Sequence, residues 1–414
     1  MFTSVDLRSI FNSIKYKRVL RWTYVRVRYF HVLQDRMAIH YNMRVLHITN
    51  DFAGSKVHCN LAKALDKEGL EQVVYCPVRN KKLLGGNQFE GNQIEFVYSN
   101  CIKSWYKYVY YFKERKLYHD LKKHVDLLRV DFIHAHTLFS DGGLAYKAHK
   151  EFGIKYAVTI RNTDINYFMR LMKHTFPYGR KILVNAEKIY FISVGLKKLF
   201  EKSSLCESIY EDIKDKFVVQ PNGIDDYWHK HINQTGHTGH VILYIGEFTP
   251  NKNVGRLIEA VKKVRAVSGL QDCRLILIGG GRDKNGEVEA LIKDSSEFVE
   301  YLGKIYDKDR LLKIMRTCAV FAMPSITETF GLVYIEALSQ NLPVIYTKNQ
   351  GIDGMFDKSI GLSVNPHSVD DIGEAITRIL EVPQAYNNMK VDFTQFKWDK
   401  IAKRYRAMYH EYNS

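Results

Sequence analysis

The sequence predicts an α/β protein built from two doubly wound parallel sheets. Short apolar runs alternate with amphipathic helical segments along most of the chain, which is the pattern of parallel strands joined by right-handed crossover helices. The alternation starts at residues 43–49 and begins afresh at 241–245, after the polar segment 230–239. A length of 414 residues suits two domains. We therefore expect two α/β domains facing each other across a cleft, which is a natural position for a ligand site.

The expected strands are short and apolar. In the first domain, expected over residues 43–225, they cover residues 43–49, 71–76, 94–97, 131–136, 157–160, 190–193 and 217–220. In the second domain, expected over residues 226–397, they cover residues 241–245, 274–278, 298–302, 319–323 and 343–346.

Composition limits the classes of partner and the cellular compartment that the protein can have. Lys and Arg number 61 against 45 Asp and Glu, a net charge of +16, which favours an anionic partner without choosing among phosphate ligands, membranes and nucleic acids. The six cysteines are scattered singly, without metal-ligand spacing, so we expect reduced thiols. We find no apolar run long enough to span a bilayer and no signal-peptide pattern. These observations predict a cytoplasmic protein, with peripheral contact to the inner face of a membrane as an option.

Two segments combine basic and aromatic side chains. Residues 1–42 hold eight Lys and Arg among apolar residues, and this extension suits a basic amphipathic helix on an anionic membrane, an ordinary extra helix, or an upstream extension of the domain that starts near Met43. Residues 105–124 are likewise aromatic and basic. They suit either a face for lipid headgroups or an undecaprenyl-type carrier, or a helix with half-buried aromatic side chains.

Two carboxylates stand at a predicted strand-loop-helix corner. A strand ends at Pro324, a loop follows, and helical spacing runs from Gly331 to Gln340 with Thr329 in the position of an N-cap. Glu328 then lies in the loop at the positive end of the helix, and Glu336 lies eight residues on, about 12 Å along a helix axis. This span matches the distance from a nucleotide ribose across a diphosphate to a sugar, and the helix N-terminus suits an anion. Alternatively, the two residues are an N-terminal charge and a solvated helix position.

Other candidates lie where predicted strands end. Gly54 is in the loop after the first strand, where backbone can approach a phosphate or an acceptor sugar. His134 and His136 share one face of their strand, and His136 is nearer the carboxyl end, where open α/β sheets place their sites. A neutral imidazole at this end can bond a sugar hydroxyl, although such a pair is also common as structure or as part of a metal site. We find no third metal ligand in the sequence.

From Met43 onward the chain resembles the retaining glycosyltransferases of family 4, which have the GT-B fold of two Rossmann-like domains. Glu328 and Glu336 reproduce the family's E-x7-E signature, and residues 220–225 (QPNGID) are similar to its PNGVD junction. Gly246 with Lys252 is similar to its diphosphate segment, and residues 396–398 (FKW) are similar to the motif before a helix that crosses back onto the first domain, here about 398–414.

The resemblance implies a role for each matched residue. Glu336 would bind the ribose of a nucleotide sugar, Glu328 the donor sugar, and Lys252 the diphosphate leaving group. Backbone N–H groups at 330–332 (Phe330, Gly331 and Leu332) would bind sugar or phosphate oxygens. Gly54, Gly246 and His136 would line the donor site. Such a site stabilises the departing nucleoside diphosphate with fixed donors and a cation, so no metal or other cofactor is expected.

The predicted function is transfer of a sugar, with retention, from a nucleotide diphosphate sugar, expected to be a UDP-sugar, to a lipid-linked or polysaccharide acceptor of the cell surface, such as lipopolysaccharide or capsule. The sequence departs from the family pattern in the diphosphate segment: Glu247 follows Gly246 where the family commonly has Arg. Either another cation, Arg161 or Arg256, compensates, or Glu247 points away. The competing hypotheses are a non-catalytic GT-B binding protein of an assembly complex and, from charge alone, a nucleic-acid binder, which the intact Glu328/Glu336 pair disfavours.

Overall fold

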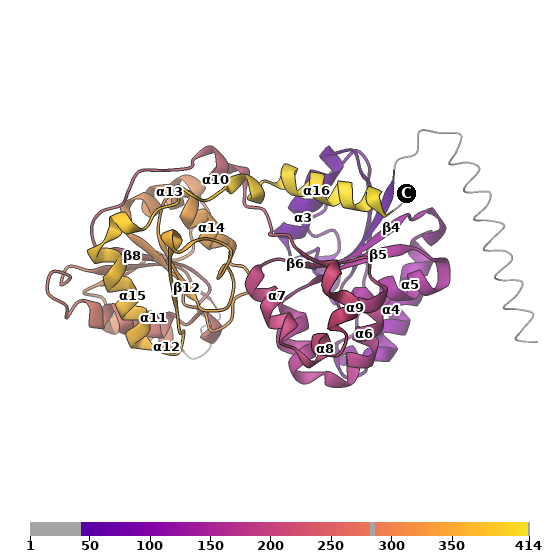
Figure 1. Ribbon diagram of the computed structural model, residues 1–414, viewed down its shortest axis with the longest axis horizontal. Helices are drawn as coiled ribbons and strands as arrows, with labels where there is room; N and C mark the ends of the chain where they lie inside the picture. Colours follow the sequence, from indigo (N-terminus) through magenta and orange to yellow (C-terminus); the bar gives the residue numbers. More distant parts are fainter. Residues whose placement is uncertain (1–42, 282–285, 413–414) are drawn as a thin grey trace, which may run out of the picture.

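The computed structural model describes residues 43–281 and 286–412, so the hypothesis of a membrane-binding extension at residues 1–42 lies outside the described residues. Two α/β lobes lie side by side (Figure 1). Each has one fully parallel sheet with helices on both faces, as the sequence predicts. The described helices include none that combines the length and the hydropathy needed to cross a bilayer.

The first lobe holds a seven-stranded sheet in the order β3-β2-β1-β4-β5-β6-β7. Its middle strands are buried on both faces, which explains why they are continuous apolar runs. The strands are β1 (Arg44–Ile48), β2 (Glu71–Pro77), β3 (Ile94–Ser99), β4 (Phe132–Ala135), β5 (Lys155–Ile160), β6 (Lys188–Phe191) and β7 (Phe217–Val219). The helices are α3 (Lys56–Lys67), α4 (Tyr110–His124), α5 (Gly142–Phe152), α6 (Phe176–Asn185), α7 (Val194–Glu201), α8 (Ser204–Glu207) and α9 (Tyr210–Ile213).

The second lobe holds a six-stranded sheet in the order β10-β9-β8-β11-β12-β13. Its strands are β8 (Val241–Gly246), β9 (Arg274–Gly279), β10 (Val299–Tyr301), β11 (Val320–Ala322), β12 (Val344–Thr347) and β13 (Gly361–Val364), and the last of these was not predicted. Its helices are α10 (Asp226–Lys230), α11 (Val254–Val264), α12 (Glu287–Asp294), α13 (Lys308–Thr317), α14 (Leu332–Ser339) and α15 (Val369–Glu381).

The C-terminal helix α16 (Trp398–Glu411) returns to the first lobe and lies along α3 (Figure 1). Its buried face joins a core with the first strands of the chain, and Tyr409 is fully buried there. The Tyr409 hydroxyl shares a hydrogen bond of 2.6 Å with His134 Nδ1 on β4. The first lobe is therefore assembled from both ends of the described chain.

The lobes also touch beside the cleft. Ser193 caps α7 by accepting a bond from the Leu196 N–H at 3.1 Å, and its hydroxyl donates to the carbonyl of Thr329 in the other lobe at 2.6 Å. A Cβ on Gly195 would lie 3.0 Å from the Gln350 backbone, so this glycine permits the close approach. The loop before α14 is thus held against the first lobe.

Candidate functional site

The corner between β11 and α14 is built around Gly331. This residue has φ +79°, and a Cβ there would lie 2.5 Å from the Tyr334 ring, so only glycine fits. Gly331 rather than Thr329 is the N-cap of α14, which corrects the expected cap, and it offers no capping side chain. The first N–H groups of α14 are left without a side-chain cap and suit an anion.

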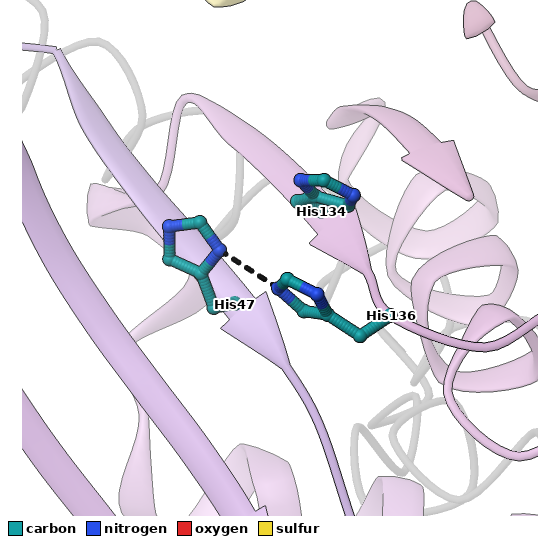
Figure 2. A group of neighbouring side chains, drawn as sticks. All are labelled: His47, His134 and His136. Carbon is teal, nitrogen blue, oxygen red and sulfur yellow. Dashed lines mark hydrogen bonds between the residues drawn. The ribbon is translucent and has the colours of Figure 1, made fainter. Parts of the chain in front are cut away.

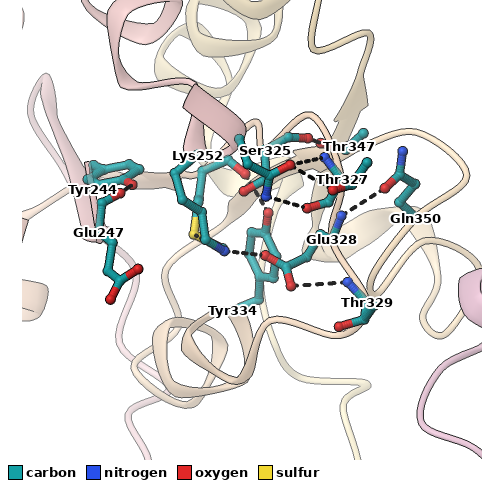
Figure 3. Close-up of polar contacts among 12 residues, drawn as sticks. Tyr244, Glu247, Lys252, Ser325, Thr327, Glu328, Thr329, Tyr334, Thr347 and Gln350 are labelled. Atoms are coloured by element: carbon teal, nitrogen blue, oxygen red, sulfur yellow. Dashed lines mark hydrogen bonds and ion pairs between the residues drawn. The ribbon is translucent and has the colours of Figure 1, made fainter. Parts of the chain in front are cut away.

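Glu328 is fixed in the loop ahead of this helix (Figure 3). Its Oε2 pairs with Lys252 Nζ at 2.6 Å, and its Oε1 accepts from the Thr329 N–H at 3.1 Å. Its own N–H donates to Gln350 Oε1 at 2.8 Å. The side chains are 10 % and 25 % exposed for Glu328 and Lys252, so the pair is partly desolvated and still open to a ligand.

Asn251 holds the lysine turn against the glutamate loop. Its Oδ1 accepts from the Thr327 N–H at 3.0 Å, its Nδ2 donates to the Thr327 carbonyl at 2.9 Å, and its backbone carbonyl accepts from the Ile326 N–H at 2.7 Å. These bonds set the position of Lys252 relative to Glu328 before any ligand arrives, which is the preorganisation that charge stabilisation requires.

A cavity of about 910 Å³ lies between the lobes. One wall is the loop and helix start Glu328–Leu332, including Phe330 and Gly331; the opposite wall comes from the first lobe and is mostly polar and aromatic. Residues of the first-lobe wall that bear on the chemistry are Thr49, Asn50, Asp51, His58, Arg79, Tyr106, Tyr110, Lys113, Thr137, Ser140, Arg161 and Asn162. Glu328 on one lobe therefore faces the polar and aromatic side chains of the other lobe across one cavity.

His136 lies one layer beneath the cavity wall, in a cluster of imidazoles (Figure 2). His47 on β1 is in register with His134 on β4, and His47 Nδ1 lies 3.1 Å from His136 Nε2. His58 lines the cavity instead, with its ring centroid 4.6 Å from that of His136. Burial lowers the pKa of His47 to about 3 and holds the pKa of His134 and of His136 well below the usual value. The cluster is neutral at physiological pH.

Three of these histidines, His47, His134 and His136, bring ring nitrogens within 4.8 Å of one another, close enough to suggest a metal site. The orientation of the imidazole rings argues against a metal site. The rings of His134 and His136 are stacked, 4.3 Å apart and 12° from parallel, so their in-plane lone pairs do not converge on a common point. Both nitrogens of His134 are also engaged, by Tyr409 and by Thr159. The arrangement is that of a hydrogen-bonded cluster.

Arg161 covers this cluster on the cavity side. Its Nε donates to the carbonyl of His136 at 3.2 Å, and the residue itself is placed by Asp164, which accepts from the Arg161 N–H at 2.9 Å. Asp164 also accepts from the N–H groups of Leu138 and Phe139, both at 3.1 Å. Of the two cations considered as replacements for the missing family arginine, Arg161 lines the cavity, whereas Arg256 donates to Asn253 and does not.

Other sequence candidates are not among the residues that line this cavity. Glu336 is a partly buried residue of α14, and burial raises its pKa to about 7. Gly54 is exposed in the turn beyond Asp51, and Gly246 ends β8, where its carbonyl would lie 1.8 Å from a Cβ on Gly279. Glu247 is exposed, and Figure 3 shows its carboxylate apart from the Lys252–Glu328 pair.

Sequence reasoning missed several residues of this site. His47 was taken as part of a buried strand, and its pairing with His134 depends on the order of the strands in the sheet, which the sequence analysis did not predict. Asn251 carried no signal because its role depends on the loop 71 residues or more away. Arg79 reaches the cavity from a loop that no motif marks, and Lys113 was noticed only as one member of the aromatic and basic segment 105–124.

Solved structures share this architecture. HepE of Anabaena, determined with UDP and glucose, superposes with a TM-score of 0.62 over 89% of this chain and 100% of that chain, at 16% identity. Two Rossmann-like domains with a cavity between them define the GT-B fold, and this chain has it.

The sequence comparisons identify the family. Residues 54–227 match Glycosyltransferase Family 4, and residues 228–394 match Glycosyl transferases group 1. An uncharacterized glycosyltransferase of Methanocaldococcus jannaschii is 25% identical over 287 residues, which is 68% of this chain and 76% of that protein. The putative teichuronic acid biosynthesis glycosyltransferase TuaC of Bacillus subtilis is 25% identical over 309 residues, 73% of this chain and 72% of that protein. The chain belongs to the group 1, family 4 glycosyltransferases.

Proposed function

We propose that the protein transfers a sugar from a UDP-sugar, with retention of configuration, to a lipid-linked or polysaccharide acceptor in the synthesis of a cell-surface polysaccharide. The observation that carries the proposal is the fixed Glu328–Lys252 pair at the uncapped amino end of α14, opening on a cavity between two lobes. HepE, determined with UDP and glucose, and TuaC, named for teichuronic acid biosynthesis, support the donor and acceptor classes.

In this proposal the residues act on the donor in order along its length. Glu336 accepts hydrogen bonds from the ribose, Lys252 and the N–H groups of residues 330–332 meet the diphosphate, with Gly246 near it, and Glu328 orients the sugar. As the bond to the diphosphate breaks, negative charge grows on the leaving group beside Lys252, and a fixed cation there lowers the barrier. His136, neutral and 3.1 Å from His47, lies behind His58 in the wall that faces the reacting sugar, and Gly54 belongs to the loop near it. We propose no metal in this chemistry.

The test is release of UDP from a panel of UDP- and GDP-sugars, with and without acceptor, together with melting shifts for each nucleotide. The expected result is a melting shift with UDP and turnover of at least one UDP-sugar, reduced in Glu328→Gln. Product anomers observed by NMR decide retention, and turnover after EDTA treatment decides metal independence. Nucleotide binding without any turnover would instead favour the non-catalytic binding protein, and preference for GDP-sugars would refute the donor assignment.

A further inference from the structure

A buried ammonium group lines the first-lobe side of the cavity, with no counter-ion among the described residues. Lys113 on α4 is 8 % exposed, and its Nζ has a hydrogen bond to Ser140 Oγ at a long 3.5 Å. Among residues 43–281 and 286–412, no carboxylate forms an ion pair with it. Burying a charge in this way is unfavourable unless another charge or several hydrogen bonds compensate, so the site is suited to an anion.

The nearby acids do not neutralise Lys113. Glu114 lies 3.8 Å from Lys147, and burial raises its pKa to about 7. Asp141 accepts a hydrogen bond from the Thr137 hydroxyl at 2.8 Å, and burial raises its pKa to about 8, so it is largely protonated at neutral pH. The carboxylate of Asp164 is occupied by three backbone N–H groups. This part of the cavity therefore keeps a positive charge.

Two arginines extend the positive region. Arg79 is exposed and lines the same cavity, and Arg161 covers its floor. Within the described parts of the chain neither forms an ion pair with a carboxylate. The acids on the cavity wall are Asp51 and Glu328, and Glu328 is held by Lys252. The acceptor end thus has cations in excess.

An aromatic rim surrounds these cations. Tyr106 and Tyr110 line the cavity, and ring contacts continue from them to the surface: exposed Trp105 lies 4.6 Å from Tyr106, and buried Phe168 lies 5.8 Å from Tyr110 and 5.3 Å from exposed Tyr167. Of the 16 exposed large hydrophobic side chains in the described chain, seven belong to two segments of this rim: Trp105, Tyr108, Val109, Tyr111, Phe112, Tyr167 and Leu171. The Tyr111 hydroxyl donates to the His174 carbonyl at 3.2 Å, which ties the two segments together. A grouped apolar surface of this kind marks an interaction site.

We propose that the acceptor is a phosphate-bearing lipid, whose phosphate binds at Lys113 and Arg79 while its hydrocarbon chain lies on the aromatic rim. The inference rests on the proposed function and deepens it by naming the acceptor class. The order of groups fits a membrane lipid: apolar surface outside, cations at the cavity entrance and within, and Glu328 on the opposite wall where the accepting hydroxyl must arrive. Amphipathic aromatic side chains beside basic ones are suited to the membrane interface.

The test is isothermal titration calorimetry of the full chain with three probes, at saturating UDP so that the donor site is filled. Farnesyl phosphate carries both groups, farnesol only the chain, and inorganic phosphate only the anion. Farnesyl phosphate is expected to bind most tightly. Lys113→Met should weaken it by about tenfold or more, which corresponds to loss of a charged hydrogen bond, and Arg79→Gln should weaken it less. Lys123→Met, the same change at an exposed position of the same helix, should have no effect.

The outcomes separate the two proposals. Equal binding of farnesyl phosphate by wild type, Lys113→Met and Arg79→Gln would overturn the phosphate site, and farnesol binding as tightly as farnesyl phosphate would do the same. Inorganic phosphate binding as tightly would leave a free-anion site and refute the lipid. Arg79→Gln changes an exposed residue, so its affinity for farnesyl phosphate tests the phosphate site even if Lys113→Met fails to fold. Failure of the donor proposal shows separately, as absence of UDP binding in the first titration.

Discussion

Replacing Lys252 by methionine should weaken the folded state and turnover together. The change keeps the length of the side chain and removes the charge that lies 2.6 Å from Glu328 Oε2. Glu328 would keep only the Thr329 N–H on its carboxylate among the described contacts. Fully buried pairs cost about 3–5 kcal/mol when one partner is removed, and exposed pairs about 0–1 kcal/mol. With side chains 10 % and 25 % exposed, this pair falls between, at about 2 kcal/mol.

A double-mutant cycle gives the decisive assay. Lys252→Met, Glu328→Gln and the double variant are compared by urea unfolding and by UDP release from the preferred UDP-sugar. The double variant leaves no unpaired charge, so it should regain at least about half of the stability lost by Lys252→Met. Turnover should not return, because the cation beside the leaving group is still missing; we expect a loss of about a hundredfold in both variants that lack it.

The matched control is the exposed pair between Lys263 and Asp370, whose side chains are 58 % and 72 % exposed. Lys263→Met should cost less than about 1 kcal/mol. The reasoning is wrong if Lys252→Met costs no more than this control, if the two site substitutions are additive in stability, or if the double variant regains turnover along with stability.

Three further predictions concern other parts of the site. Burial raises the pKa of Asp141 to about 8, above its unfolded value, so the folded state binds a proton that the unfolded state releases, and stability falls as pH rises from about 4 to 8. Asp141→Asn should reduce the decrease in melting temperature over this pH range and leave stability at pH 4 unchanged. An unaltered dependence of melting temperature on pH would contradict the assignment. Glu336→Gln should weaken UDP binding about tenfold. It should also stabilise the ligand-free protein at pH 8, because burial raises the pKa of Glu336 to about 7 and so disfavours the charged carboxylate in the folded state. UDP binding as tight as in the wild type would show that Glu336 does not contact the ribose. Gly331→Ala should lower the free energy of unfolding in urea by about 1–3 kcal/mol more than Gly153→Ala. Both residues have positive φ, but only at Gly331 would a Cβ meet a neighbour, the Tyr334 ring at 2.5 Å. Equal losses of stability would mean that the ring moves aside.

The sequence was sufficient for the sheets because buried parallel strands are apolar along their whole length. The strand it missed, β13, lies at the sheet edge and reads Gly-Leu-Ser-Val, half small or polar, so the continuous apolar run of a buried parallel strand is missing and four residues are too few for their alternation to stand out. The prediction that Thr329 caps the helix was wrong because of the backbone conformation at Gly331. Local preference favours a hydroxyl there, but the backbone passes through a left-handed conformation at Gly331, and the helix starts after it.

The donor side of the site was predictable to the extent that it is local. Glu328, Gly331 and Leu332 are neighbours in sequence, and all three line the cavity. On the first-lobe wall the sequence marked only Arg161 and the aromatic and basic segment 105–124, because the wall residues come together through tertiary structure: Lys113 meets Ser140 across 27 positions, and Arg79 comes from another loop. The pairing of Lys252 with Glu328 spans 76 positions and was not predicted, although the resemblance to family 4 marked both residues as candidates.

The return of α16 to the first lobe has a consequence for biosynthesis. Tyr409 fills the core of that lobe and bonds His134, 275 positions earlier, so this lobe cannot seal its interior until Tyr409 has left the exit tunnel of the ribosome. Until then Met43, Val45 and Phe132 lack the helix that covers them. The amino-terminal lobe begins folding first and is completed last, and a nascent chain stalled before Trp398 would present an apolar groove to chaperones.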